Sequence, residues 1–279
     1  MQKIVLVLLG LALVFSSAQA QTPKWKAWEV EADTLLNRQD YNGAIKLYTK
    51  VISASKLKER DDYAAVYKRG LSYYSSQNFT KAIEDMNLFV PQFPESFQAH
   101  VLRALSYREL GDSENQLKDV EEAFRISKGD AQIMRWRASL YLEMEKFQEA
   151  IDDLVIVKLV QDDAEIEMNL GFAYYSVGQK DSAFVAINRA IEMEATYLPA
   201  YLYGGSFALQ ESEYELALKY LNIALRLDPE NYTAWFYKGI ALIELKKEDQ
   251  GCSCLQKAFY GGQDDAGDYL KQYCFSVED

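Results

Sequence analysis

Small residues recur along this chain with a period of about thirty-four residues, and this spacing limits the possible folds more than any other feature. One series consists of Ala32, Gly70, Ala104, Ala138, Gly171, Gly205 and Gly239. A second series follows twelve residues later, at Ala44, Ala82, Gln116, Ala150, Ala183, Ala217 and Gly251. Helices need Ala or Gly where a neighbouring helix approaches closely, because a larger side chain holds the two backbones apart. Two such contacts per period predict one helical hairpin repeated seven times, which is typical of a solenoid.

Apolar residues keep the same period. Four residues after the second small residue stand Tyr48, Met86, Val120, Leu154, Ile187, Leu221 and Leu255. Three residues further on stand Val51, Phe89, Ala123, Val157, Ala190, Ala224 and Ala258. Spacings of three and four place side chains on one stripe of a helix, so we expect these residues to form the buried face of each second helix.

The pattern resembles the tetratricopeptide repeat, which runs W-x2-L-G-x2-Y and continues with A, F, A and P. Its clearest copies are the run from Trp235 to Gly239 and the run from Tyr214 to Ala224, which is followed by Pro229. The resemblance covers roughly residues 25–260. It implies an all-α fold, a right-handed α-solenoid of seven helix-turn-helix hairpins in residues 21–262, with a C-terminal capping helix and tail in residues 263–279.

Two departures from the pattern are informative. The third repeat has Gln116 in place of Ala and His100 in place of Trp, so we expect its packing to be the loosest. The first spacing is 38 residues, and its extra length falls in the charged stretch 56–62, which predicts a solvated connection between helices.

The first twenty residues have the pattern of a secretory signal peptide. Lys3 supplies the positive charge, residues 4–15 form an uncharged apolar run, and Ala18-Gln19-Ala20 is a small-residue cleavage signature before Gln21. The run is shorter than the roughly 20 apolar residues of a membrane span. We therefore predict an exported protein without a membrane span, located in the periplasm or, alternatively, secreted.

The chain is strongly acidic. Its formal charge is -12, and loss of residues 1–20, whose one charged residue is Lys3, changes this to -13. Phosphate backbones are bound through excess Lys and Arg, so we do not expect nucleic acid as a partner. Much of the acidity is explained by solvation of outer helix faces.

All three cysteines lie near the end of the chain, at Cys252, Cys254 and Cys274. Cys252 and Cys274 are symmetric about residue 263, close to the pair Gly261-Gly262, and an exported chain meets oxidants, so a disulfide between them is predicted. On a helix, Cys252 shares a stripe with Leu255 and Phe259, and Cys254 points about 160° away. The ending is similar to that of exported tetratricopeptide proteins of Bacteroidota-type bacteria. Three free or buried thiols remain the alternative.

No residue pattern indicates catalysis, a metal or a cofactor. The single histidine, His100, is expected to be a satisfied interior residue. Three cysteines without a nearby histidine make a poor zinc set. Adjacent carboxylates such as Asp152-Asp153 point about 100° apart on a helix and are expected on a solvated face. The prediction is a non-enzymatic protein without a cofactor.

Recognition of other proteins is the function that the resemblance implies, since the first helices of similar proteins line a groove that holds a peptide or a partner helix. Matching positions give a groove of Tyr67, Leu71, Tyr74, Arg135, Phe172, Tyr175, Leu202 and Phe236. Exposed apolar surface of this kind usually marks a binding site. We therefore predict a scaffold that binds other envelope or secreted proteins. The alternative is a self-associating structural protein whose groove is a homo-oligomer interface.

Two further expectations concern the groove. Tyr74, Phe172, Tyr175 and Phe236 stand at positions that the repeat does not need for its own packing, so we expect their rings to be exposed. A carboxylate clamp of the kind found in chaperone-binding relatives is not expected. Arg135 and Asn169 match two of its members, but Pro199 and Tyr203 stand where its last two cations belong.

Cleavage after Ala20 is directly testable. The mature protein purified from its native host should begin at Gln21, because the signature ends there. Intact-mass spectrometry checks this, and recovery of the uncleaved chain from the cytoplasm would contradict it.

Overall fold

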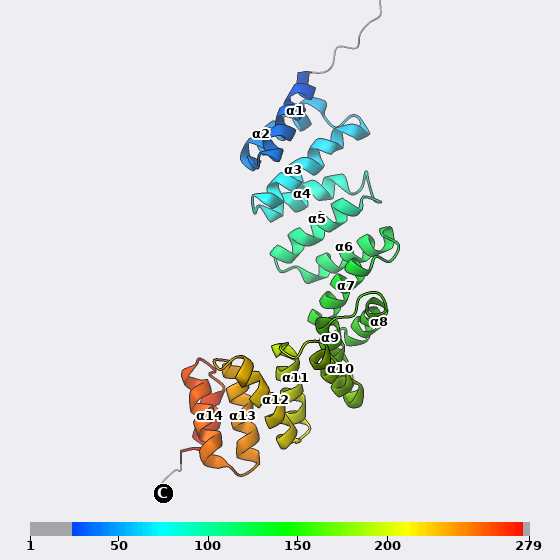
Figure 1. The fold of residues 1–279 in the computed structure, drawn as a ribbon. Helices are drawn as coiled ribbons and strands as arrows, with labels where there is room; N and C mark the ends of the chain where they lie inside the picture. Colours follow the sequence, from blue (N-terminus) through cyan, green and yellow to red (C-terminus); the bar gives the residue numbers. More distant parts are fainter. Residues whose placement is uncertain (1–23, 276–279) are drawn as a thin grey trace, which may run out of the picture. The chain divides into compact units, whose positions relative to one another are not determined.

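The computed structural model describes residues 24–275, and in this range the chain forms fifteen α-helices, one short 3-10 helix and no strand (Figure 1). This all-helical architecture confirms the predicted fold class. The predicted signal peptide and its cleavage site at Ala20 and Gln21 lie outside the described residues.

The helices divide into two compact units, with the boundary between Leu110 and Gly111. The helices of the first unit are α1 (Lys24–Asn37), α2 (Tyr41–Ser55), the 3-10 helix η1 (Arg60–Asp62), α3 (Tyr63–Ser75), α4 (Phe79–Phe89) and α5 (Phe97–Glu109). Those of the second unit are α6 (Ser113–Ile126), α7 (Ala131–Glu143), α8 (Phe147–Lys158), α9 (Ala164–Ser176), α10 (Lys180–Met193), α11 (Leu198–Gln210), α12 (Tyr214–Leu227), α13 (Tyr232–Glu244), α14 (Glu248–Tyr260) and α15 (Ala266–Tyr273). The boundary falls inside the third hairpin, the one whose small-residue pattern Gln116 interrupts.

Close contacts between the two helices of a hairpin explain the periodic small residues. A Cβ atom added to Gly70 of α3 would lie 2.6 Å from Met86 Cε of α4. One added to Gly239 of α13 would lie 2.7 Å from Leu255 Cγ of α14. Real Cβ atoms do not approach that closely, so the pattern is required by packing. The predicted second-helix stripe is buried throughout, at Tyr48, Met86, Val120, Leu154, Ile187, Leu221 and Leu255.

The turn inside each hairpin uses one recurring backbone conformation. A residue with positive φ stands at the same position in every repeat, at Gln39, Gln77, Gly111, Glu145, Gly178, Ser212 and Lys246. In the first turn the Asp40 amide donates to the Leu35 carbonyl at 2.9 Å, a bond that closes the end of α1. The Asp40 side chain then accepts from the Gly43 amide at 2.9 Å and caps α2.

Buried ion pairs link the helices of two hairpins. Arg69 of α3 donates two hydrogen bonds to Asp85 of α4, at 2.6 and 2.9 Å, and Arg137 of α7 binds Asp153 of α8 in the same way, at 2.7 and 2.8 Å. The prediction of a solvated face was therefore wrong for Asp153, which is buried, although Asp152 is exposed. Burial raises the pKa of Asp85 above its usual value, although the hydrogen bonds and charge of Arg69 act in the opposite direction. A buried pair of this kind specifies an arrangement more than it adds stability, and losing one partner is costly.

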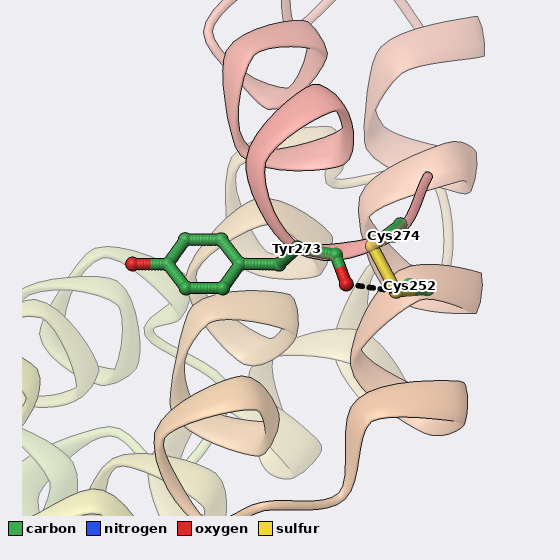
Figure 2. Close-up of a disulfide and its surroundings, with 3 residues drawn as sticks. All are labelled: Cys252, Tyr273 and Cys274. Carbon is green, nitrogen blue, oxygen red and sulfur yellow. Dashed lines mark hydrogen bonds between the residues drawn. A yellow bond between two sulfur atoms is a disulfide. The ribbon is translucent and has the colours of Figure 1, made fainter. Parts of the chain in front are cut away.

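The C-terminal helix is fastened by the predicted disulfide. The sulfur atoms of Cys252 and Cys274 are 1.99 Å apart, which joins α14 to the residue that follows α15 (Figure 2). The helix itself is α15, which ends at Tyr273 within the range predicted for a capping helix and tail.

The helix α14 buries Leu255 and Ala258 as predicted, but Cys254 and Phe259 were predicted on the wrong sides of it. Its buried residues are Gly251, Cys254, Leu255 and Ala258, and Phe259 is exposed. The reason is that α14 packs against α13 through the face that carries Gly251. Burial raises the pKa of the free thiol of Cys254.

Loss of the disulfide should destabilise the protein without unfolding its repeats. The bond spans 22 residues, so Cys252→Ser should lower the free energy of unfolding by roughly 3 kcal/mol in the chain-entropy account. Thermal melting under oxidising conditions measures this, with reduced wild type as the control. Equal melting of oxidised wild type and the variant would contradict the prediction, and peptide mapping should find Cys254 unpaired.

Candidate partner-binding surface

The first helices of successive hairpins form a layer of their own in the second unit. Helix α11 contacts both α9 and α13, although each is separated from it by an intervening second helix. We call the exposed side of α9, α11 and α13 the first-helix surface. The small residues let each second helix pack closely against its own first helix. The first helices therefore contact one another, and the first-helix surface is continuous.

The predicted groove residues of the first unit lie on α3. Tyr67, Leu71 and Tyr74 are half-buried. The ring of Tyr67 lies 5.3 Å from that of Phe89, and the ring of Tyr74 lies 5.6 Å from that of Phe79. These tyrosines therefore contribute to packing and expose only part of their surface.

Aromatic rings form a connected group on the first-helix surface of the second unit. Phe172 of α9 contacts Phe147 at 5.7 Å and Tyr203 of α11 at 5.3 Å, measured between ring centroids. Tyr175 of α9 stacks on Phe207 of α11 at 4.0 Å, with the rings 5° from parallel. Contacts of this geometry stabilise beyond the area they bury. The expectation that Phe172 and Tyr175 are free of internal packing was wrong, although both remain half-buried.

A cavity of about 260 Å³ lies beside this group, between α11 and α13. Its walls are Leu202, with Pro199, Tyr203 and Ser206 of α11 and Thr233 and Tyr237 of α13. The walls are largely apolar and include hydroxyl-bearing residues, which suits an aliphatic or aromatic side chain of a bound segment.

Tyr203 and Tyr237 were not among the predicted groove residues. Each follows a predicted groove position by one residue, so the surface is rotated slightly about the axes of α11 and α13. The spacing of Pro199, Tyr203 and Ser206, which is four and then three residues, is the sequence signal that identifies this stripe.

Phe236 does not belong to the exposed surface. Only 8% of it is accessible, and it packs against Ile243, Leu255, Ala266 and Leu270. The ring of Tyr269 from α15 meets it edge-on at 5.5 Å. The prediction for Phe236 was wrong because α15 covers the side of α13 that a further first helix would otherwise occupy.

Charged residues border the first-helix surface. Arg135 of α7 binds Asp163 at 2.6 Å and also Glu165, so its charge is already balanced within the protein. The Tyr175 hydroxyl donates to Glu211 at 2.8 Å, and Lys180 binds the same carboxylate at 2.6 Å. Burial, followed by the neighbouring Glu211, raises the pKa of Tyr175 to about 12. These pairs hold the rim in place and leave the centre of the surface apolar.

The structure places the single histidine and the side chains that could bind a metal. His100 is buried, and its Nε2 lies 3.0 Å from the Pro94 carbonyl oxygen, as expected for an interior histidine. Between residues 24 and 275, no three His, Cys, Asp or Glu side chains converge as a metal site would require. Within the same range, every helix is too short or too polar to span a bilayer.

Stacked helical hairpins with an exposed layer of first helices define an α-solenoid repeat protein. Family models described as tetratricopeptide repeat match residues 30–97, 97–130 and 205–250. The chain belongs to the tetratricopeptide repeat family. Comparison with curated protein sequences gives no match.

Solved structures show the same fold. The C-terminal part of a tetratricopeptide repeat protein from Cytophaga hutchinsonii superposes with a TM-score of 0.65 and 16% identity, over 86% of this chain and 98% of that one. A repeat protein from Parabacteroides merdae gives 0.60 and 13%, over 90% and 99%. YrrB, described as having an unusual peptide-binding site, gives 0.52 and 18%, over 70% and 97%.

Removal of the Phe236 ring tests its place in the core. Phe236→Ala should lower the free energy of unfolding by about 3–5 kcal/mol, because it empties a buried site beneath α15. Phe275→Ala is the control, since Phe275 is 59% exposed. Thermal melting should separate the two variants. Equal melting temperatures would show that Phe236 is an exposed residue and not part of the core.

Proposed function

We propose that this protein is a non-catalytic scaffold of the cell envelope that binds a peptide or helix of a partner protein on its first-helix surface. The observation that carries the proposal is the apolar cavity of Leu202, Tyr203 and Tyr237, which lies beside the aromatic group on α9 and α11. The family and the peptide-binding description of YrrB agree with this mode of binding.

Two features support location in the envelope. The signal-peptide pattern of residues 1–20 and the disulfide of Cys252 and Cys274 both suit an oxidising compartment outside the cytoplasm. The partner is accordingly expected among envelope or secreted proteins.

Site-specific crosslinking in the native host tests the binding surface. A photoreactive amino acid at Ser206, on the cavity wall, should give a crosslink to a partner protein. The same group at Lys219, an exposed residue of the second helix α12, should not. Leu202→Ala combined with Tyr237→Ala should reduce the Ser206 crosslink at least about tenfold, because each well-packed contact contributes about 2 kcal/mol.

Each other outcome decides against the proposal. A partner crosslinked from Lys219 alone would place binding on the second-helix side. A crosslink between two copies of the chain would identify the surface as a homo-oligomer interface. An undiminished crosslink in the double variant would show that the cavity is not used.

A further inference from the structure

Helix α15 is attached to the rest of the protein by few side chains. Of its 8 residues, only Ala266 and Leu270 are buried. Tyr269 adds its edge-on contact with Phe236 at 5.5 Å. A helix of this length is not stable on its own in water, because the first turn is costly to form and few further turns repay it. The docking of α15 therefore depends on these contacts and on the disulfide that follows the helix.

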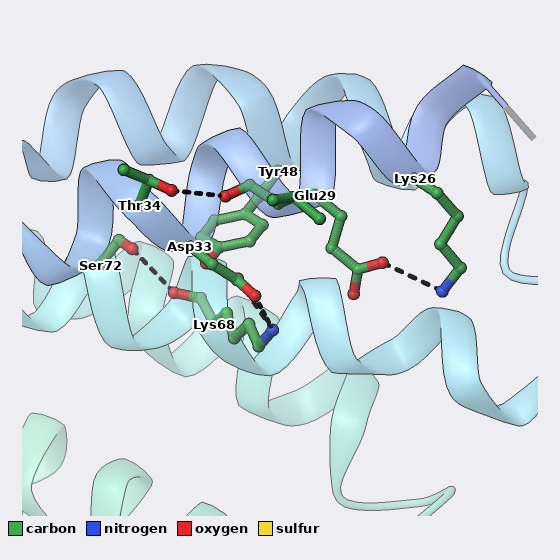
Figure 3. Close-up of polar contacts among 8 residues, drawn as sticks. Lys26, Glu29, Asp33, Thr34, Tyr48, Lys68 and Ser72 are labelled. Atoms are coloured by element: carbon green, nitrogen blue, oxygen red, sulfur yellow. Dashed lines mark hydrogen bonds and ion pairs between the residues drawn. The ribbon is translucent and has the colours of Figure 1, made fainter.

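Polar contacts add little to this attachment. Within the described part of the chain, the ion pair of α15 is internal to the helix, between Lys271 and Asp268 at 3.2 Å. The first repeat shows the contrast, because there Asp33 of α1 accepts from Tyr48 of α2 at 2.6 Å and from Lys68 of α3 at 2.8 Å (Figure 3). Ion pairs and hydrogen bonds between side chains thus join α1 to its neighbours, whereas α15 relies on apolar contacts and a covalent bond.

The segment before α15 contains a possible pivot. Gly261 is held in place, since a Cβ atom added there would lie 2.0 Å from Tyr232 Cδ1. Gly262 has a φ of 96° and open space around the position of a Cβ. Asp265, which precedes the helix, makes no capping bond through its side chain. Because glycine adopts many backbone conformations, the chain after Gly262 is able to change direction without strain.

The disulfide is accessible to a reductant in solution. Cys252 and Cys274 are both partly exposed, at the end of α15 (Figure 2). Disulfides open by attack of a thiolate on sulfur, so the rate depends on access to the bond. The free thiol of Cys254 is buried on the face of α14 that packs against α13, about 160° around the helix from Cys252. The attacking thiolate must therefore come from another molecule.

An apolar face of the last hairpin lies beneath α15. It consists of Phe236 and Ile243 of α13 with Leu255 and Ala258 of α14, which form one cluster with the two buried residues of α15. The four residues are at most 8% exposed. Loss of α15 would bring this face into contact with water.

We propose that the disulfide of Cys252 and Cys274 is a redox latch, and that its reduction releases α15 and uncovers the apolar face of the last hairpin. A thiolate of a dithiol reductant attacks one of the two sulfurs and forms a mixed disulfide. The other cysteine leaves as a thiolate and takes up a proton. The second thiol of the reductant then displaces the remaining cysteine, so two electrons pass to the protein and the reductant becomes a disulfide. The last hairpin is closed when oxidised and open when reduced.

Hydrogen–deuterium exchange with the full mature protein tests the latch. Oxidised protein is compared with protein reduced by dithiothreitol, and alkylation followed by mass spectrometry counts the free thiols. Amides of α15 should exchange at least about tenfold faster in the reduced form, and those of α13 should change by less than about twofold, because only α15 opens. Fluorescence of an anilinonaphthalene dye should rise as the apolar face becomes accessible. Reoxidation should reverse both changes.

Variants of the three cysteines separate release of α15 from other effects. Cys252→Ser combined with Cys274→Ser should exchange like the reduced protein in the absence of reductant. Cys254→Ala is the matched control, since it removes the cysteine of α14 that lies outside the disulfide, and should exchange like oxidised wild type. In the double variant Cys254 is the remaining thiol. Slow reaction of this buried thiol with a thiol reagent would show that α14 stays packed on α13.

Equal exchange of α15 in the oxidised and reduced proteins would overturn the proposal, because the helix would then stay docked without the bond. Faster exchange of α13, or rapid reaction of Cys254 in the double variant, would also overturn it, since the whole hairpin would then be unfolding. Persistence of the disulfide in dithiothreitol that reduces oxidised glutathione would show that the bond is not accessible. These measurements need no partner protein, so their outcome is separate from the crosslinking test of the first-helix surface.

Discussion

The close approach of the two helices within each hairpin is the contact on which the rest of the structure depends. A large apolar side chain of the second helix packs directly against a Gly or Ala of the first helix. Leu221 packs in this way against Gly205, and Ile187 against Gly171. Added Cβ atoms at these glycines would lie within 2.9 Å of the partner side chain. Because each hairpin is closed in this way, the remaining apolar surface of its first helix is available to the next hairpin or to a ligand. The first-helix surface is thus a product of the packing within hairpins.

Much of this fold is predictable from sequence because the packing repeats. Both small-residue series and the apolar stripe of the second helices are where their spacing indicates. Errors arose where a contact with another helix decides which residue is buried. Phe236 is covered by α15, which follows the last hairpin, and Cys254 is buried because Gly251 turns that face toward α13. Asp153 is buried because it pairs with Arg137, a contact made between two helices. Single-helix periodicity cannot show such contacts.

The residues of the candidate sites were likewise predictable where the repeat determines their position and not where contacts between helices do. Leu202, Phe172 and Tyr175 lie on the predicted side of their helices, since that side is set by the repeat. Tyr203 and Tyr237 were missed because a rotation of a fraction of a turn decides which neighbouring residue faces the cavity. A pocket of the first unit, beside Arg60, depends on residues added to the repeat, so its lining is visible only when α1, η1, α3 and the end of α4 are seen together. This pocket combines charged residues with aromatic rings, whereas the cavity between α11 and α13 is largely apolar.

The turns inside the hairpins are positions at which the free energy of unfolding could be increased. Gly111 and Gly178 adopt positive φ without steric cost, and nothing lies within 4 Å of the position a Cβ would take there. The other five turns place Gln39, Gln77, Glu145, Ser212 and Lys246 in the same conformation, which costs a non-glycine residue roughly 1 kcal/mol or more. The helices on either side therefore impose the turn on residues that do not favour it. None of these five positions lines the cavity between α11 and α13, so the thermal tolerance of the scaffold is adjustable without changing the walls of that cavity.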